Sequence, residues 1–284
     1  MRIEKLGLHH KELLAPLLRA ITVPVSEYCF ANLYLFRESH GYEVLSDGDI
    51  YIKGRTYEGL SYLMPTRPAG LLDQTRLVEH LREVDMLFPI PEDWLGAFDP
   101  DRYEISFHEG DADYLYTVEK MSTLAGRKLH KKRNLLKQFL EAYRHEAVPL
   151  TADRMDDARL IVDGWQKGTG LDAGQTDFGP CREALDRYEE LVLCGGIYYA
   201  EGEPAGFVLG EEVNDETFVL HFAKALTKFK GVYQFMFNNF AKIRPPKYKY
   251  MNLEQDLDKE NLRVFKTSYV PDALVKKARV RLRR

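Results

Sequence analysis

Apolar and polar positions along the chain change their spacing several times, which predicts a mixture of helices and strands. In the second half, GIYYA, EPAGFVLGEEV and ETFVLHFA alternate as strands do, and short GE and ND turns between them are typical of an antiparallel meander. The spacing around them predicts a strand near 145–150, helices at about 153–167, 179–193, 231–243 and 259–267, and strands at 247–253 and 268–271.

The first half repeats much of this order. Its spacing predicts helices at about 9–19, 26–38, 73–84 and 91–97, and strands at 42–46, 49–53, 58–64, 85–89 and 102–108. No residue-level repeat is visible, so only the matching order of elements suggests a duplication. We therefore expect an α/β (α+β) protein of two tandem domains with mixed sheets.

A basic segment, GRKLHKKRNLLKQFLEAY, predicts a linking helix over 126–144. It divides the chain into an N-terminal domain at 1–125 and a C-terminal domain at 145–284. The first turns of this helix carry Lys131, Lys132 and Arg133. Two interpretations are open: these are solvated cations, or they bind phosphate groups, which lysine and arginine neutralise without sequence specificity.

Composition limits the partners. With a net charge of -4 and a pI of about 6.1, the chain is not a polycation built for nucleic acid, so an anionic partner must bind a local patch. The cationic end ALVKKARVRLRR is expected to be either a solubilising or an anion-binding tail. No apolar run reaches the roughly 18 to 20 residues of a membrane span and no signal-peptide core is present, which predicts a cytoplasmic location. The three dispersed cysteines fit no ligand spacing, so no metal is expected.

The segment NLEQDLDKENLRVFKTSYVP, residues 252–271, concentrates polar side chains beside a strand end. Alternation puts Asn252 and Glu254 on one face of that strand, and Asp256 follows. A short helix then presents Arg263 and Lys266 three residues apart on one side. The pattern is compatible with a salt-bridged connection and with a functional site.

The same segment resembles the closing signature of the family that includes the C-terminal domain of phosphatidylglycerol lysyltransferase. The matching positions are Asn252, Glu254, Asp256, Leu257, Leu262, Arg263, Lys266, Ser268, Tyr269 and Pro271. Three more stretches agree: CFANLYLFR, LAGRKLHKKRNLLKQF and LHFAKALTKFKGVYQFMFNNFA. The resemblance implies two tandem GNAT-like (GCN5-related N-acetyltransferase) domains, as in the aminoacyl-tRNA-dependent lipid and peptidoglycan transferases, and the order of elements also resembles that fold.

Four departures from the family pattern bear on the chemistry. Ala223 stands where the family usually has Glu, Leu253 replaces Arg, and Asp258 and Asn261 replace glycines. If the missing Glu binds a cationic aminoacyl group in the relatives, this chain handles a different substrate. A non-catalytic binding or regulatory protein on the same scaffold is the alternative.

The acyl donor is the second open question. In CoA-dependent acetyltransferases, a glycine-rich loop opens the helix after the meander and holds the pyrophosphate. In this chain the corresponding loop runs from Lys228 to Tyr233. Gly231 is its one glycine, and Tyr233 has a bulky side chain at a position where close approach of the backbone to phosphate favours Gly or Ala. We therefore expect no cofactor; acyl-CoA is disfavoured, and an atypical acetyl-CoA-dependent N-acetyltransferase remains an alternative.

The leading hypothesis is a transferase that moves an acyl or aminoacyl group to an amine or hydroxyl acceptor, with aminoacyl-tRNA or an anionic lipid headgroup as partner. Such a reaction needs a proton acceptor, Asp256 or Glu254, and a cation near the oxyanion, Arg263 or Lys266. The expected substrate-binding residues are Lys224, Gln234, Asn238, Asn252 and Tyr269, and the expected anion-binding residues are Lys131, Lys132 and Arg133.

Overall fold

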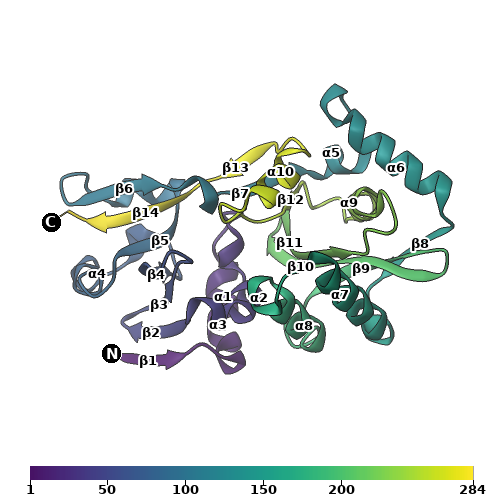
Figure 1. Cartoon of the computed structure of the whole chain (residues 1–284). Helices are drawn as coiled ribbons and strands as arrows, with labels where there is room; N and C mark the ends of the chain where they lie inside the picture. Colours follow the sequence, from purple (N-terminus) through teal and green to yellow (C-terminus); the bar gives the residue numbers. More distant parts are fainter. Residues whose placement is uncertain (284) are drawn as a thin grey trace. The chain divides into compact units, whose positions relative to one another are not determined.

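The computed structural model describes residues 1–283 and contains two compact units (Figure 1). Unit 1 comprises Met1–Asp113, Gln255–Glu260 and the chain from Leu274 onward, and unit 2 comprises Tyr114–Glu254 and Asn261–Ala273. Each unit is built on a seven-stranded sheet with both parallel and antiparallel pairs. The expected α/β class with two mixed sheets is therefore confirmed.

The sheet of unit 1 has the strand order β1-β2-β3-β4-β5-β14-β6. Its strands are β1 (Arg2–Lys5), β2 (Glu43–Asp47), β3 (Asp49–Arg55), β4 (Ser61–Pro65), β5 (Met86–Pro91), β6 (Tyr103–Phe107) and β14 (Lys277–Leu282). The helices of this unit are α1 (Lys11–Arg19), α2 (Phe30–Leu35), α3 (Arg37–His40) and α4 (Gln74–Leu81).

The second sheet has the order β13-β7-β12-β11-β10-β9-β8. Its strands are β7 (Asp113–Thr117), β8 (His145–Pro149), β9 (Cys194–Ala200), β10 (Glu203–Asn214), β11 (Thr217–Ala225), β12 (Tyr250–Asn252) and β13 (Ala273–Val275). The helices that follow β7 along the chain are α5 (Val118–Thr123), α6 (His130–Ala142), α7 (Met155–Thr169), α8 (Phe178–Asp186), α9 (Val232–Lys242) and α10 (Glu260–Thr267).

The two sheets match strand for strand, with β1 to β5 corresponding to β8 to β12. The sixth place of each sheet is taken by a strand from the other half of the chain. The last strand, β14, lies between β5 and β6, whereas β7 lies between β12 and β13. The common order supports a duplication in which the two halves exchange their final strands.

This exchange corrects the interpretation of the C-terminus as a tail. The segment KARVRL is a strand with neighbours on both sides, and Ala278 and Val280 are fully buried. Its alternation of charged and apolar residues is a strand pattern that the high charge concealed. Because of this exchange, the boundaries of the compact units differ from the expected boundaries at 125 and 145. Unit 1 includes the chain from Leu274 onward.

The core of unit 2 lies between its sheet and α9. Helix α9 turns the apolar residues Val232, Phe235, Met236 and Phe240 toward Phe218 and other buried residues of the sheet. The linking helix forms as α6, and its Phe139 stacks on Phe235 at 4.8 Å. Figure 1 shows α7 and α8 on the opposite face of this sheet from α9.

Strands β11 and β12 separate soon after they meet. They pair in parallel over three positions, the last of which joins Val219 to Asn252. Beyond this point β11 continues to Ala225, while the chain leaves β12 through residues 253–259 toward α10. Side chains near this separation form the candidate site.

Candidate functional site

A bulge in β11 places a histidine at the separation of the strands. Phe222 pairs with Leu209 and Leu220 pairs with Gly210, so His221 is the extra residue. A bulge of this kind turns a side chain away from the regular pleat. Gly210 permits the close approach, because a Cβ atom there would lie 1.9 Å from the carbonyl oxygen of Val219.

His221 lies between two carboxylates. Its Nδ1 is 2.7 Å from Oε1 of Glu254, its Nε2 is 3.0 Å from Oε1 of Glu211, and its side chain is fully buried. Burial by itself would lower the pKa of this imidazole, but the hydrogen bonds to both carboxylates and their negative charges raise it to about 10. At neutral pH, His221 is therefore an imidazolium that donates one hydrogen bond to each carboxylate.

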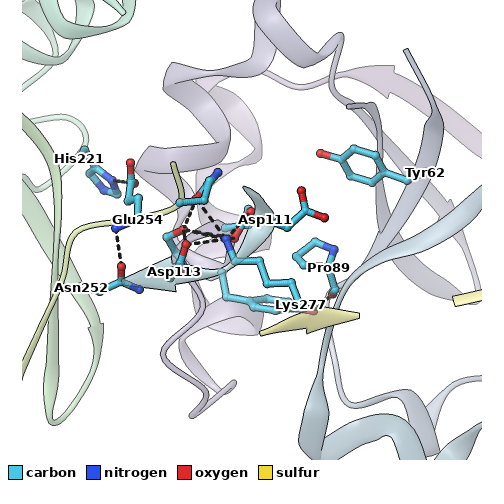
Figure 2. Close-up of polar contacts among 12 residues, drawn as sticks. Tyr62, Pro89, Asp111, Asp113, His221, Asn252, Glu254 and Lys277 are labelled. Atoms are coloured by element: carbon cyan, nitrogen blue, oxygen red, sulfur yellow. Dashed lines mark hydrogen bonds and ion pairs between the residues drawn. The ribbon is translucent and has the colours of Figure 1, made fainter. Parts of the chain in front are cut away.

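The backbone of Glu254 is held in an uncommon conformation. Its φ of 59° lies in the left-handed region, which costs a residue with a side chain about 1 to 2 kcal/mol. Three contacts fix it: its N–H donates to Oδ1 of the buried Asn252 at 2.6 Å, and its carbonyl accepts from Nζ of Lys266 at 3.0 Å and from the N–H of Tyr114 at 3.2 Å. Figure 2 shows Glu254 between His221 and Asn252. Strain held in this way is a feature of functional sites.

A second charged group lies further along β11. The Nζ of Lys224 donates to both carboxylate oxygens of Asp177, at 2.6 and 2.7 Å, and lies 3.7 Å from the centre of the Trp165 ring. Asp177 precedes α8, but its carboxylate pairs with Lys224 rather than capping the helix. Lys224 is thus held by an anion and an aromatic face.

Two of the expected substrate-binding residues, Gln234 and Asn238, make internal contacts. The side-chain amide of Gln234 donates to the hydroxyl of the buried Tyr269 at 2.9 Å. The amide of Asn238 donates to the carbonyls of Met121 and Ser122 at the end of α5. These contacts fix α9 against its neighbours, and burial raises the pKa of Tyr269 above its usual value.

The three expected anion-binding residues on α6 have different surroundings. Lys131 is exposed. The Nζ of Lys132 lies 4.1 Å from the centre of the Tyr269 ring, and its partial burial lowers its pKa. Arg133 donates to the carbonyls of Leu124 and Gly126 beyond the end of α5. Lys131 is therefore the member of this set best exposed to a ligand.

The structure brings Asn252, Glu254 and Lys266 together in unit 2, where Arg263 is half-buried on α10. Asp256 belongs to unit 1. It is buried, and its Oδ1 accepts from the N–H of Asp258, whose φ of 56° is also left-handed.

Sequence reasoning did not identify His221, Glu211, Asp177 or Trp165 as site residues. Strand alternation cannot place His221, because the bulge breaks the period of two at that residue. Asp177 has the sequence context of a helix cap, which conceals its pairing with Lys224.

Unit 1 contains a buried ionic cluster of its own, made of Glu27, Asp113 and Lys277, which we call the junction cluster. The Nζ of Lys277 is 2.6 Å from both Oε2 of Glu27 and Oδ1 of Asp113, and none of the three side chains is more than 7% exposed. It also lies 3.1 Å from Oε1 of Gln255. Figure 2 shows Lys277 against Asp113. Asp113 and Lys277 are the first residues of the exchanged strands β7 and β14.

Within residues 1–283, no helix is both long and apolar enough to cross a membrane. In the same range, no group of three or more His, Cys, Asp and Glu residues is arranged to hold a metal ion.

Two sheets of equal strand order, each with a parallel pair beside its exchanged strand, define a protein of the tandem GNAT-like acyltransferase class, as expected. The family described as phosphatidylglycerol lysyltransferase, C-terminal, matches residues 19–280, and the chain belongs to it. Fold and family together indicate a transferase of the acyl or aminoacyl kind.

Three similar proteins show how far the likeness extends. A crystal structure of a conserved protein of unknown function from Bacteroides thetaiotaomicron has a TM-score of 0.86 and 25% identity, with all of both chains covered. The C-terminal domain of a proposed lysylphosphatidylglycerol synthetase from Agrobacterium fabrum has a TM-score of 0.65 and 14% identity over 98% of this chain and 93% of that one. An uncharacterised protein of Mycoplasmoides gallisepticum is 23% identical over 77% of this chain and 72% of its own length.

Proposed function

We propose that this protein transfers an aminoacyl group from an ester donor, such as aminoacyl-tRNA, to an amine or hydroxyl acceptor. The observation that carries the proposal is the contact between Glu254 and the bulge residue His221, at the point where β11 and β12 separate. A carboxylate held in one position at the end of a strand can accept a proton from a bound nucleophile. The family supports the same reaction class.

In this mechanism, the acceptor attacks the ester carbonyl while its proton passes to the Glu254 carboxylate. A bond from the acceptor to the carbonyl carbon forms, the ester C–O bond breaks, and the proton leaves with the released hydroxyl. His221 donates a hydrogen bond to the Glu254 carboxylate and so holds it in place. Lys266, which contacts the Glu254 carbonyl, supplies positive charge near the developing oxyanion, with Arg263 as the second candidate.

The loop before α9 supports a donor other than acyl-CoA. Gly231 has a φ of 89°, and a Cβ atom there would lie 2.3 Å from the carbonyl oxygen of Leu135, so the backbone of α6 occupies the space against this glycine. Tyr233 is half-buried, and its ring stacks on that of Phe237 with 6.5 Å between the ring centres. A pyrophosphate bound in the usual way needs free backbone at this loop. We therefore propose that the reaction uses no CoA.

An anionic partner would use the exposed cations that precede and begin α6, which are Arg127, Lys128 and Lys131. The phosphates of tRNA or of a lipid headgroup have the matching charge. We place the protein in the cytoplasm, where charged tRNA is found.

The proposal is tested by incubating the full chain with charged tRNAs and with amine, hydroxyl and lipid acceptors, and by detecting transfer with mass spectrometry. The Glu254→Gln variant should lose about 10²- to 10⁴-fold in rate, because it removes the proton acceptor but keeps the size of the side chain. The matched control is Glu216→Gln, since Glu216 forms an exposed ion pair with Lys249 on the same unit.

Equal rates in both variants would contradict the role of Glu254. Absence of transfer from every charged tRNA, together with tight binding of one of the acceptors, would favour the non-catalytic alternative. Transfer from acetyl-CoA, or micromolar affinity for it by calorimetry, would favour the acetyltransferase alternative.

A further inference from the structure

Trp165, Asp177 and Lys224 form a group that we call the cation box. The ammonium of Lys224 lies over the indole face and gives two hydrogen bonds to the carboxylate, while its side chain is 7% exposed. An aromatic face with a carboxylate is the chemistry by which proteins bind a ligand's ammonium group. In this protein the bound ammonium group belongs to Lys224 of the same chain.

The box is partly open. The carboxylate side chain of Asp177 is 33% exposed, so one side of the box faces solvent.

The box lies beside the candidate site on the same strand. Lys224 follows His221 by three residues on β11, beyond the last position at which β12 pairs. Ala223 and Ala225 pack toward the core under α9, so Lys224 projects from the opposite face of the strand. A substrate held at Glu254 can therefore extend along β11 toward Trp165 and Asp177.

We propose that Lys224 is an internal occupant of the cation box and that it determines donor specificity. A cationic side chain of the donor cannot enter the box, because Lys224 occupies it and repels a second positive charge. A neutral side chain is not repelled and does not need the box. The proposal rests on the proposed function and names its substrate class: an aminoacyl group without a cationic side chain, such as alanyl rather than lysyl.

Binding can be measured without turnover. The chain has two tryptophans, so the Trp94→Phe variant leaves Trp165 as the fluorescent reporter. In this background, we would titrate lysinamide and alaninamide, which differ in the side-chain ammonium. The Lys224→Met variant should bind lysinamide about tenfold more tightly or better, with quenching of Trp165, and should bind alaninamide as the parent does.

Two variants serve as controls. Lys249→Met removes an exposed cation of the same unit and should bind both amides as the parent does. Adding Asp177→Asn to Lys224→Met should remove the gain for lysinamide. If Lys224→Met shows no gain, or if the gain survives Asp177→Asn, the cation box is not an ammonium site.

The Lys224→Ala variant gives a second test, even if it is less stable than the parent. n-Propylammonium reproduces the three carbons and the ammonium group that this substitution removes, so it should raise the melting temperature of Lys224→Ala but not that of Lys249→Met. No selective rise would overturn the proposal. Failure of the proposed function is distinguishable, because a protein that transfers nothing can still show the selective gain for lysinamide.

Discussion

At the scale of single residues, the segment after β12 is notable for its backbone. Glu254, Leu257 and Asp258 have φ values of 59°, 55° and 56°, although none of them is glycine. The side chains of Asn252 and Asp256 compensate, since each accepts a hydrogen bond from the N–H two residues further on. The family pattern has glycine at the place of Asp258, and the left-handed backbone gives the physical reason.

Replacing Asp258 tests this reason. Asp258→Ala and Asp258→Gly both remove the carboxylate, but alanine carries a Cβ atom into a left-handed backbone. Asp258→Ala should therefore be less stable than Asp258→Gly by about 1 to 2 kcal/mol. Urea unfolding followed by circular dichroism measures the difference, and equal stabilities would show that the backbone at this position relaxes.

At the scale of elements, the exchanged strands meet in the junction cluster. Asp113 begins β7, Lys277 begins β14, and their charged atoms lie 2.6 Å apart without exposure to solvent. Ser26 adds two hydrogen bonds to Asp113, one from its N–H at 2.8 Å and one from its hydroxyl at 3.1 Å. The cluster therefore connects the start of β14 with the start of β7 through buried ion pairs and hydrogen bonds.

Removing the cation of this cluster should be costly. Lys277→Met leaves Glu27 and Asp113 buried without a counter-charge, and breaking a buried ion pair in this way typically costs about 3 to 5 kcal/mol. The neighbouring Lys276→Met is the control, because the exposed pair of Lys276 with Glu92 is worth about 0 to 1 kcal/mol. Equal unfolding midpoints in urea for the two variants would exclude a structural role for the cluster.

The same cluster makes stability depend on pH. Burial, together with the charge of Asp113, raises the pKa of Glu27 from 4.5 to about 7, although Lys277 opposes the shift. The folded protein thus holds a proton that the unfolded chain releases, so this contribution to stability is complete below pH 4.5 and is lost as the pH rises through 7.

Glu27→Gln cannot release this proton. The free energy of unfolding of the parent relative to that of Glu27→Gln should therefore fall between pH 4.5 and 7. Urea titrations of both proteins at several pH values measure this difference. A constant difference across the range would mean that Glu27 is ionised in the folded state.

At the scale of the whole molecule, neither half of the chain contains all the strands of a sheet. The first half lacks β14, and the second lacks β7, which lies between β12 and β13. A sheet without its sixth strand exposes the hydrogen-bonding edges on either side of the gap.

Separate halves should therefore fail to fold alone. Fragments 1–125 and 145–284, divided as the sequence suggests, should be insoluble or lack cooperative unfolding. A chain nicked within 124–128, between α5 and α6, should stay folded, because each sheet keeps its strands. Cooperative thermal unfolding of either isolated fragment would show that the exchange is dispensable.

The sequence by itself determined the class of fold, the meander, the order of most elements, the family and the polar segment that follows β12. These features depend on local periodicity and on motif residues adjacent in the chain, which a single sequence records. Asn252, Glu254 and Lys266 were predicted as site residues on this basis, and the structure brings them together.

Only the tertiary structure decided the partners of these residues and the path of the chain ends. His221 meets Glu211 and Glu254 because a bulge shifts the register, and Lys224 meets Asp177 across 47 positions. The charged C-terminal segment becomes an inner strand because β5 and β6 pair with it on both sides, and its Lys277 forms ion pairs with two buried carboxylates. Contacts of this range depend on packing between distant segments, which no local pattern records.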